Sequence, residues 1–294
     1  MWTPALGRFW RKKMKSFRDY FNEMAKQITF MDSEFYPDYL ETAKATYIHF
    51  FEVFTTMCNE QSSSEALLLE ITKITDSSRI QLLRLFRLFF SPDTSVEMLK
   101  RKGKIPEIIS EFGSRFRDIN EVKKNLSKRG LNDETLFAIL YEYKDRGQNG
   151  YELTEHFFTW FKRKYGEKYS IEGPIRAGSD VILNKRLKNY KYDTPADFLI
   201  TDKTGKELII GFARYDSDRG GSQEDDRTSG NQDKVTHIRE WCIENNCLVK
   251  IVFLNDGPGL LLGSMWEDYS KIEESWPGQV TVLTLRMLED RFPL

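Results

Sequence analysis

The 294-residue chain has few cysteines, no long apolar run and almost no excess of charge of either sign. Its three cysteines, Cys58, Cys242 and Cys247, are too few for a disulfide framework and fit a reducing compartment. No stretch approaches the roughly 18 apolar residues of a membrane-spanning helix, and no apolar segment of the secretory type follows the basic residues near the N-terminus. The sequence therefore predicts a cytoplasmic protein without a membrane partner.

The charges of the chain are almost balanced, with 44 lysines and arginines against 45 aspartates and glutamates. A protein that coats nucleic acid without specificity is usually basic overall, so the balance argues against that class. The balanced charge is still compatible with a local basic face beside a group of metal-binding acids. Because 40% of the residues are hydrophobic and 30% are charged, we expect a packed core rather than a disordered chain.

Helical periodicity of apolar and aromatic residues predominates in the first half of the chain. Residues 145–150 are polar and rich in turn formers, which indicates a domain boundary. We therefore predict an all-helical domain over residues 1–147 and a second domain over residues 148–294. Helices of the first domain are predicted over residues 8–26, 38–57, 64–73, 80–90, 96–102, 122–129 and 133–144.

The second half changes from helical to mixed patterning. A strand at 207–215, a helix at 231–245 and a mostly apolar strand at 248–254 indicate a parallel pairing through a crossover helix on a buried sheet. The sequence therefore predicts an α/β fold with a mixed central sheet flanked by helices. Its other predicted elements are a helix over 151–165 and strands over 180–183, 196–200 and 279–285.

Acidic side chains gather around the second and third of these strands. Asp197 follows Pro195 at the start of one strand, a position where a simple turn residue is also common. Asp216 and Asp218 alternate just beyond the next strand, and more acids follow at 224–226. These acids fit either a metal site or a solvated acidic loop.

Residues 150–235 resemble type II restriction endonucleases, and the order helix, three strands, helix, strand is similar to the core of the PD-(D/E)XK nuclease superfamily. The resemblance implies a restriction-endonuclease-like core preceded by the helical domain. It also implies Mg²⁺ as cofactor, double-stranded DNA as substrate, a homodimer and a prokaryotic cytoplasm. The helical domain would then supply recognition or dimer contacts. Its landmarks are Gly150-Tyr151-Glu152-Leu153-Thr154-Glu155, Gly173-Pro174, Ala177-Gly178-Ser179-Asp180, Pro195-Ala196-Asp197 and the run from Gly211-Phe212-Ala213-Arg214 to Gly220-Gly221.

The resemblance also assigns roles to residues, with one departure. Asp197 takes the place of the family's first acid and Arg214 that of its lysine, so the second acid falls on Phe212, which binds no metal. Asp216 or Asp218 can supply the missing acid, or Glu224 and its acidic neighbours can, or the site is degenerate. Asp180 and Glu155 are further candidate metal ligands, although Asp180 also suits a strand start.

DNA contacts are predicted in the segment that follows the strand at 207–215. Its side chains carry the donors and acceptors that base edges and phosphates need, although a flexible loop and a helix cap explain the same residues. The sequence thus predicts a Mg²⁺-dependent, sequence-specific endonuclease. The alternatives are another DNA-processing nuclease of this fold and a catalytically inactive DNA-binding protein. The predicted DNA-contacting residues are Arg219, Gln223, Arg227 and Asn231.

Overall fold

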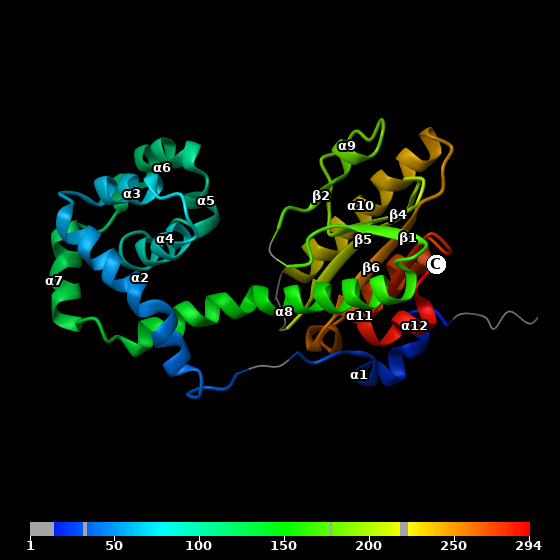
Figure 1. Cartoon of the computed structure of the whole chain (residues 1–294), viewed down its shortest axis with the longest axis horizontal. Coiled ribbons are helices and arrows are strands. Elements are labelled where there is room, and N and C mark those ends of the chain that lie inside the picture. Colours follow the sequence, from blue (N-terminus) through cyan, green and yellow to red (C-terminus); the bar gives the residue numbers. More distant parts are fainter. Residues whose placement is uncertain (1–14, 32–33, 177, 218–222) are drawn as a thin grey trace, which may run out of the picture. The chain divides into compact units, whose positions relative to one another are not determined.

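A computed structural model describes residues 15–31, 34–176, 178–217 and 223–294, with side chains for all of these except 143–149 and 223–229 (Figure 1). The chain divides into two compact units. One comprises Ser33–Asp145, and the other comprises Met1–Asp32 together with Arg146–Leu294. Each unit has a hydrophobic core of its own, and together they make a mixed α/β protein.

The helical unit is built on buried aromatic and aliphatic side chains, among them Phe51 and Phe86. Four of its helices begin at capping residues, Ser63, Ser95, Asp118 and Asp133, whose side chains accept hydrogen bonds from backbone N–H groups of the first turn. The aromatic stripe in the sequence is therefore core. The elements are α2 (Leu40–Glu60), α3 (Ser64–Lys73), α4 (Ser78–Phe89), α5 (Val96–Lys100), η2 (Lys102–Lys104), α6 (Ile105–Phe112), η3 (Gly113–Arg115), α7 (Ile119–Arg129) and the first part of α8 (Glu134–Tyr165).

Helix α8 runs without a break through residues 145–150, where the sequence indicated a turn-rich boundary. The prediction of a turn there is wrong, although the two units do divide between Asp145 and Arg146, inside the helix. A glycine in a helix costs only about 1 kcal/mol relative to alanine. Adding residues to an existing helix is cooperative, so buried turns on both sides carry the helix across the polar stretch.

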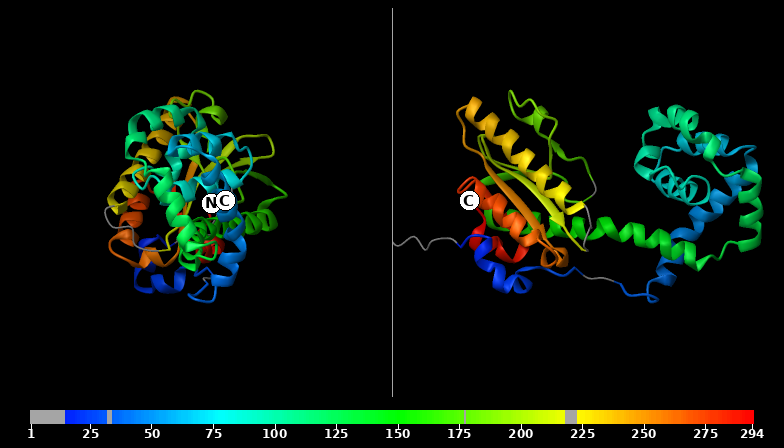
Figure 2. Two further views of the ribbon diagram at one scale, coloured as in Figure 1. Left: turned by 90° about the vertical axis from the view of Figure 1, so that its left-hand side faces the viewer. Right: turned by 180° about the vertical axis from the view of Figure 1, so that it is seen from behind.

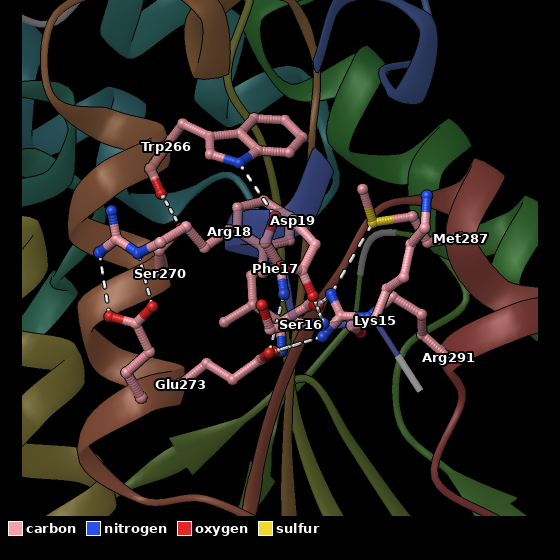
Figure 3. Close-up of polar contacts among 12 residues, drawn as sticks. Lys15, Ser16, Phe17, Arg18, Asp19, Trp266, Ser270, Glu273, Met287 and Arg291 are labelled. Carbon is pink, nitrogen blue, oxygen red and sulfur yellow. Dashed lines mark hydrogen bonds and ion pairs between the residues drawn. The ribbon is translucent and has the colours of Figure 1, made fainter. Parts of the chain in front are cut away.

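The N-terminal segment belongs to the sheet unit, although the sequence placed residues 1–147 in one helical domain. Its elements are η1 (Arg18–Glu23) and α1 (Met24–Gln27). Phe17 is fully buried and stacks on Trp266 of α11 (Met265–Ser275) with ring centroids 4.1 Å apart (Figure 3). The backbone N–H of Phe17 donates to Glu273 at 2.9 Å. Burial of this aromatic residue explains why the segment leaves the helical unit.

The sheet has five strands in the order β1-β4-β5-β6-β7. The first two pairings are antiparallel and the last two are parallel. The parallel pair of β5 and β6 is joined by α10 (Gln223–Glu244), which confirms the predicted crossover. The strands are β1 (Tyr169–Glu172), β4 (Phe198–Asp202), β5 (Glu207–Tyr215), β6 (Lys250–Asp256) and β7 (Val280–Leu283).

Helices α10 and α8 cover opposite faces of this sheet (Figure 2). On one face, Phe157 of α8 packs on Phe198 of β4 with ring centroids 4.6 Å apart. On the other, Lys234 of α10 lies over the ring of Phe212 in β5. The C-terminal elements η4 (Pro258–Leu261), η5 (Leu285–Met287) and α12 (Leu288–Arg291) complete the unit.

Between β1 and β4 the chain leaves the main sheet in a short excursion. It consists of β2 (Val181–Ile182), α9 (Leu183–Arg186) and β3 (Pro195–Ala196), with β2 and β3 paired antiparallel. Across the described residues of both units, no helix combines the length and the apolar character needed to cross a membrane.

Candidate functional site

Asp197 lies where the excursion returns to the main sheet. Its carboxylate accepts a hydrogen bond from the backbone N–H of Ala213 at 2.9 Å, and its own N–H donates to Gly211 O at 3.0 Å. Burial raises the pKa of the Asp197 carboxyl, against the lowering effect of the Ala213 N–H, and the nearby carboxylate of Asp180 raises it further. Two backbone contacts to β5 therefore fix a half-buried carboxylate beside another acid.

A glycine lets the backbone of Asp197 approach the chain just beyond β1. Gly173, just beyond β1, has φ +144°, and a Cβ there would lie 2.2 Å from the carbonyl oxygen of Asp197. No L side chain fits that gap, and the backbone conformation itself favours glycine. The sequence landmark Gly173-Pro174 therefore has a structural role next to Asp197.

The register of the excursion brings Asp180 toward Asp197. Val181 pairs with Ala196 in the antiparallel β2–β3 ladder, so the register places Asp180 opposite Asp197 just beyond the last pair of the ladder. Both aspartates line one cavity of about 400 Å³. The negative charge of Asp180 is one cause of the raised pKa of Asp197, and a cation between the two carboxylates would relieve that repulsion.

Asp216, predicted as a metal ligand, forms an ion pair with Arg214 in the structure. Its carboxylate is buried and accepts a hydrogen bond from Arg214 Nε at 2.8 Å, as the alternation of side chains along β5 allows. Arg214 lines the 400 Å³ cavity and a neighbouring one of about 280 Å³, whereas Asp216 is not among the described residues that line either. The structure thus makes Asp216 the partner that holds the guanidinium group in place.

Lys234 is a site residue that the sequence analysis missed. It projects from α10 with Nζ 4.4 Å from the ring centroid of Phe212 and lines the 280 Å³ cavity with Asp197 and Arg214. Burial lowers the pKa of the Lys234 ammonium group, Asp197 opposes that shift by raising it, and the like charge of Arg214 lowers it. Phe212, which stands where an acid was expected, holds a cation beside Asp197 through a cation–π contact.

The remaining predicted residues fall into two groups. Asn231, predicted as a DNA contact, lines the 280 Å³ cavity. Glu155 of α8 instead forms an ion pair with Arg176, whose Nε donates to it at 2.9 Å. Two further predicted residues, Asp218 and Arg219, lie outside the described residues. For Gln223, Glu224 and Arg227 the structure describes the helical backbone of α10 but no side chain.

The two acids of the site match part of the usual ligand set of Mg²⁺. Among the residues that the structure describes, no cluster of three or more His, Cys, Asp and Glu side chains could hold a metal ion. Mg²⁺ in enzymes of phosphate chemistry is usually held by one or two carboxylates, with water and substrate phosphate completing the shell. Asp197 and Asp180 fit that donor set, and a bound phosphate would supply the rest.

Comparisons with protein-family models and with curated proteins find no match for this chain.

Proposed function

We propose that this protein is a Mg²⁺-dependent endonuclease that cuts double-stranded DNA at specific sequences, in the manner of type II restriction endonucleases. One observation carries the proposal. Asp197, Asp180, Arg214 and Lys234 line two cavities that share Asp197 and Arg214 at one end of a mixed sheet. Two acids for a divalent cation and two cations for a phosphate are what phosphodiester hydrolysis needs.

The order of the elements supports a PD-(D/E)XK-type core. From α8 onward the main sheet unit runs helix, three strands, helix, strand, as α8, β1, β4, β5, α10 and β6. The antiparallel pairs come first and the parallel pair follows the crossover helix. Asp197 precedes β4 and Arg214 lies near the end of β5, at the positions that the family pattern gives to its first acid and its lysine.

Each residue then has a chemical role. When bound, Mg²⁺ would act as a Lewis acid and lower the pKa of an attacking water. Asp197 and Asp180 would hold the ion. Lys234 and Arg214 stabilise the negative charge that develops on the phosphate, in a partly water-excluded site where such charges act strongly. The charge-assisted hydrogen bond from Arg214 to Asp216 keeps the guanidinium group oriented.

Incubation of the purified protein with phage DNA and Mg²⁺ tests the proposal. Discrete bands that disappear on chelation are expected for a sequence-specific enzyme, and a smear indicates a non-specific DNA-processing nuclease of the same fold. Cutting both strands at a palindromic site is most simply achieved by a homodimer. We therefore expect the active species to have the mass of two chains in light scattering.

A second candidate function rests on Phe212. A family member that lacks its second acid can lose catalysis and keep DNA binding, which would make this protein a binding module. Asp180 beside Asp197 favours the enzyme, because a pure DNA-binding surface gains nothing from paired carboxylates that repel phosphate. A gel shift that needs no Mg²⁺ and leads to no cutting would establish the binding module instead.

A further inference from the structure

Asn255 lies near the carboxyl end of β6, in register with Arg214 on the neighbouring parallel strand. Its side chain is buried, with 2% of the residue exposed, and lines the 280 Å³ cavity together with Asp197, Arg214 and Lys234. Ligands of α/β sheets bind in the crevice beyond the carboxyl ends of the parallel strands. Asn255 is therefore in a position where a side chain meets a ligand.

The amide group of Asn255 donates to no acceptor among the described residues. A buried N–H without an acceptor is costly, and native proteins keep few of them outside functional sites. An asparagine at a strand end in the core is easily replaced by an apolar residue of similar volume. Its presence in the wall of the cavity indicates that a ligand supplies the acceptor.

The charges of the cavity indicate what kind of acceptor this is. Two of its lining residues, Arg214 and Lys234, are cations that only donate hydrogen bonds. Asp197 already accepts the Ala213 N–H with one of its carboxylate oxygens. A phosphate oxygen satisfies two cations and an amide donor at the same time.

The backbone next to Asn255 is firmly held. The carboxylate of Asp256 accepts hydrogen bonds from the backbone N–H groups of Thr29 at 2.6 Å, Gly257 at 2.7 Å and Leu285 at 2.9 Å. Side chains alternate along a strand, so Asp256 fixes the strand end from one face while Asn255 points to the other. The amide is thus held in place before any ligand arrives.

We infer that Asn255 is a phosphate-binding residue, whose side-chain N–H groups donate to a non-bridging oxygen of the phosphate that enters the cavity of Lys234 and Arg214. This inference deepens the proposed nuclease function and rests on it for the identity of the natural ligand, a DNA phosphodiester. The inference itself concerns phosphate binding, which can be measured without any cleavage.

The test uses the full chain, inorganic phosphate as the probe and the variant Asn255→Leu, with Asn120→Leu on the exposed face of α7 as the matched control. We expect Asn255→Leu to weaken phosphate binding in calorimetry by roughly tenfold, the loss of one charge-assisted hydrogen bond. Its unfolding temperature without phosphate should equal or exceed that of the wild type, because the variant removes a buried donor that has no acceptor among the described residues. Asn120→Leu should change neither quantity.

Three results would overturn the inference: a wild-type protein that binds no phosphate, an Asn255→Leu variant that binds it equally well, or one that unfolds at a clearly lower temperature. The last would mean that the amide serves the fold. A protein that binds phosphate through Asn255 but never cuts DNA would support the inference and overturn the nuclease proposal, so the two failures are distinguishable.

Discussion

Phe212 of β5 stands where the resemblance to the nuclease family places an acid, and its aromatic ring contacts a cation instead. Its ring occupies the position of an expected acid on β5, and the face of that ring lies 4.4 Å from the ammonium nitrogen of Lys234. A carboxylate at 212 would bind a metal, whereas the ring positions a cation. In the proposed function Asp180 supplies the second acid, because the β2–β3 register brings it near Asp197.

Replacement of Lys234 by methionine should lower the rate constant of the DNA cleavage step by roughly 100- to 1000-fold, because the transition state loses a preorganised positive charge. Methionine keeps the contact with Phe212, so the unfolding temperature should change little. The measurement is single-turnover cleavage together with DNA affinity in Ca²⁺, and Lys188→Met on the exposed excursion is the control. Equal loss of affinity and rate would show that Lys234 acts in ground-state binding and not in catalysis.

Asp180→Asn should reduce cleavage at low Mg²⁺ and recover much of it at high Mg²⁺, because the variant loses a ligand of the ion. Asp216→Asn should lower the rate at every Mg²⁺ concentration, since it frees Arg214 without touching the ion. Cleavage rates across a Mg²⁺ titration separate the two cases, with the exposed Asp193→Asn as control. Rescue of Asp216→Asn and not of Asp180→Asn would restore the original assignment of Asp216 as a metal ligand.

The sequence predicts only those site residues that lie within a recognisable motif. Asp197 and Arg214 could be predicted from their places beside two adjacent strands. Lys234 could not, because a lysine between polar residues on a helix has no distinguishing pattern until the helix is packed on a sheet. Its position three residues after Asn231 and directly before the buried Val235 was the one available signal.

At the scale of elements, the N-terminal segment is held by a buried ion pair (Figure 3). Arg291 is 1% exposed, and its Nη2 donates to Glu273 at 2.6 Å, while its Nε donates to Lys15 O at 3.0 Å. Glu273 in turn accepts the N–H of Phe17. The pair thus connects the start of the chain to α11 and α12.

Arg291→Met should lower the free energy of unfolding of the sheet unit by about 3–5 kcal/mol, because it leaves the largely buried carboxylate of Glu273 without its cationic partner. Chemical denaturation followed by tryptophan fluorescence measures this, because all six tryptophans of the chain belong to the sheet unit. Lys271→Ala, which breaks an exposed pair with Asp268 on the same helix, should have almost no effect. If the two variants behaved alike, the buried pair would not be what anchors the segment.

The fold could be predicted where periodicity is strong and not where tertiary contacts decide. The β5–α10–β6 crossover follows from an apolar strand, a helix and a second apolar strand. The continuity of α8 does not follow, because its polar middle has turn-forming residues and is helical only through the packed turns on either side. Likewise, no local pattern connects Phe17 with Trp266, which is 249 residues away.

At the scale of the whole molecule, the two units have separate hydrophobic cores. A fragment of residues 33–145 should therefore fold alone and show a cooperative thermal transition by circular dichroism.

A fragment of residues 146–294 should be much less stable than the full sheet unit, because it lacks Phe17 and the segment that packs on α11. A peptide of residues 15–31 added in excess should raise its transition temperature. For the fragment of residues 33–145, a non-cooperative transition would show that the helical unit depends on the sheet unit for its folding.

The central claim is that DNA hydrolysis depends on the carboxylate of Asp197. The most direct measurement compares the wild type, Asp197→Asn and Asp193→Asn for cleavage of phage DNA in Mg²⁺, with DNA binding followed in parallel. We predict discrete fragments for the wild type and Asp193→Asn. For Asp197→Asn we predict no cleavage but equal or tighter binding, since the variant loses a metal ligand and a charge that repels phosphate. Cleavage by Asp197→Asn at the wild-type rate would contradict the account.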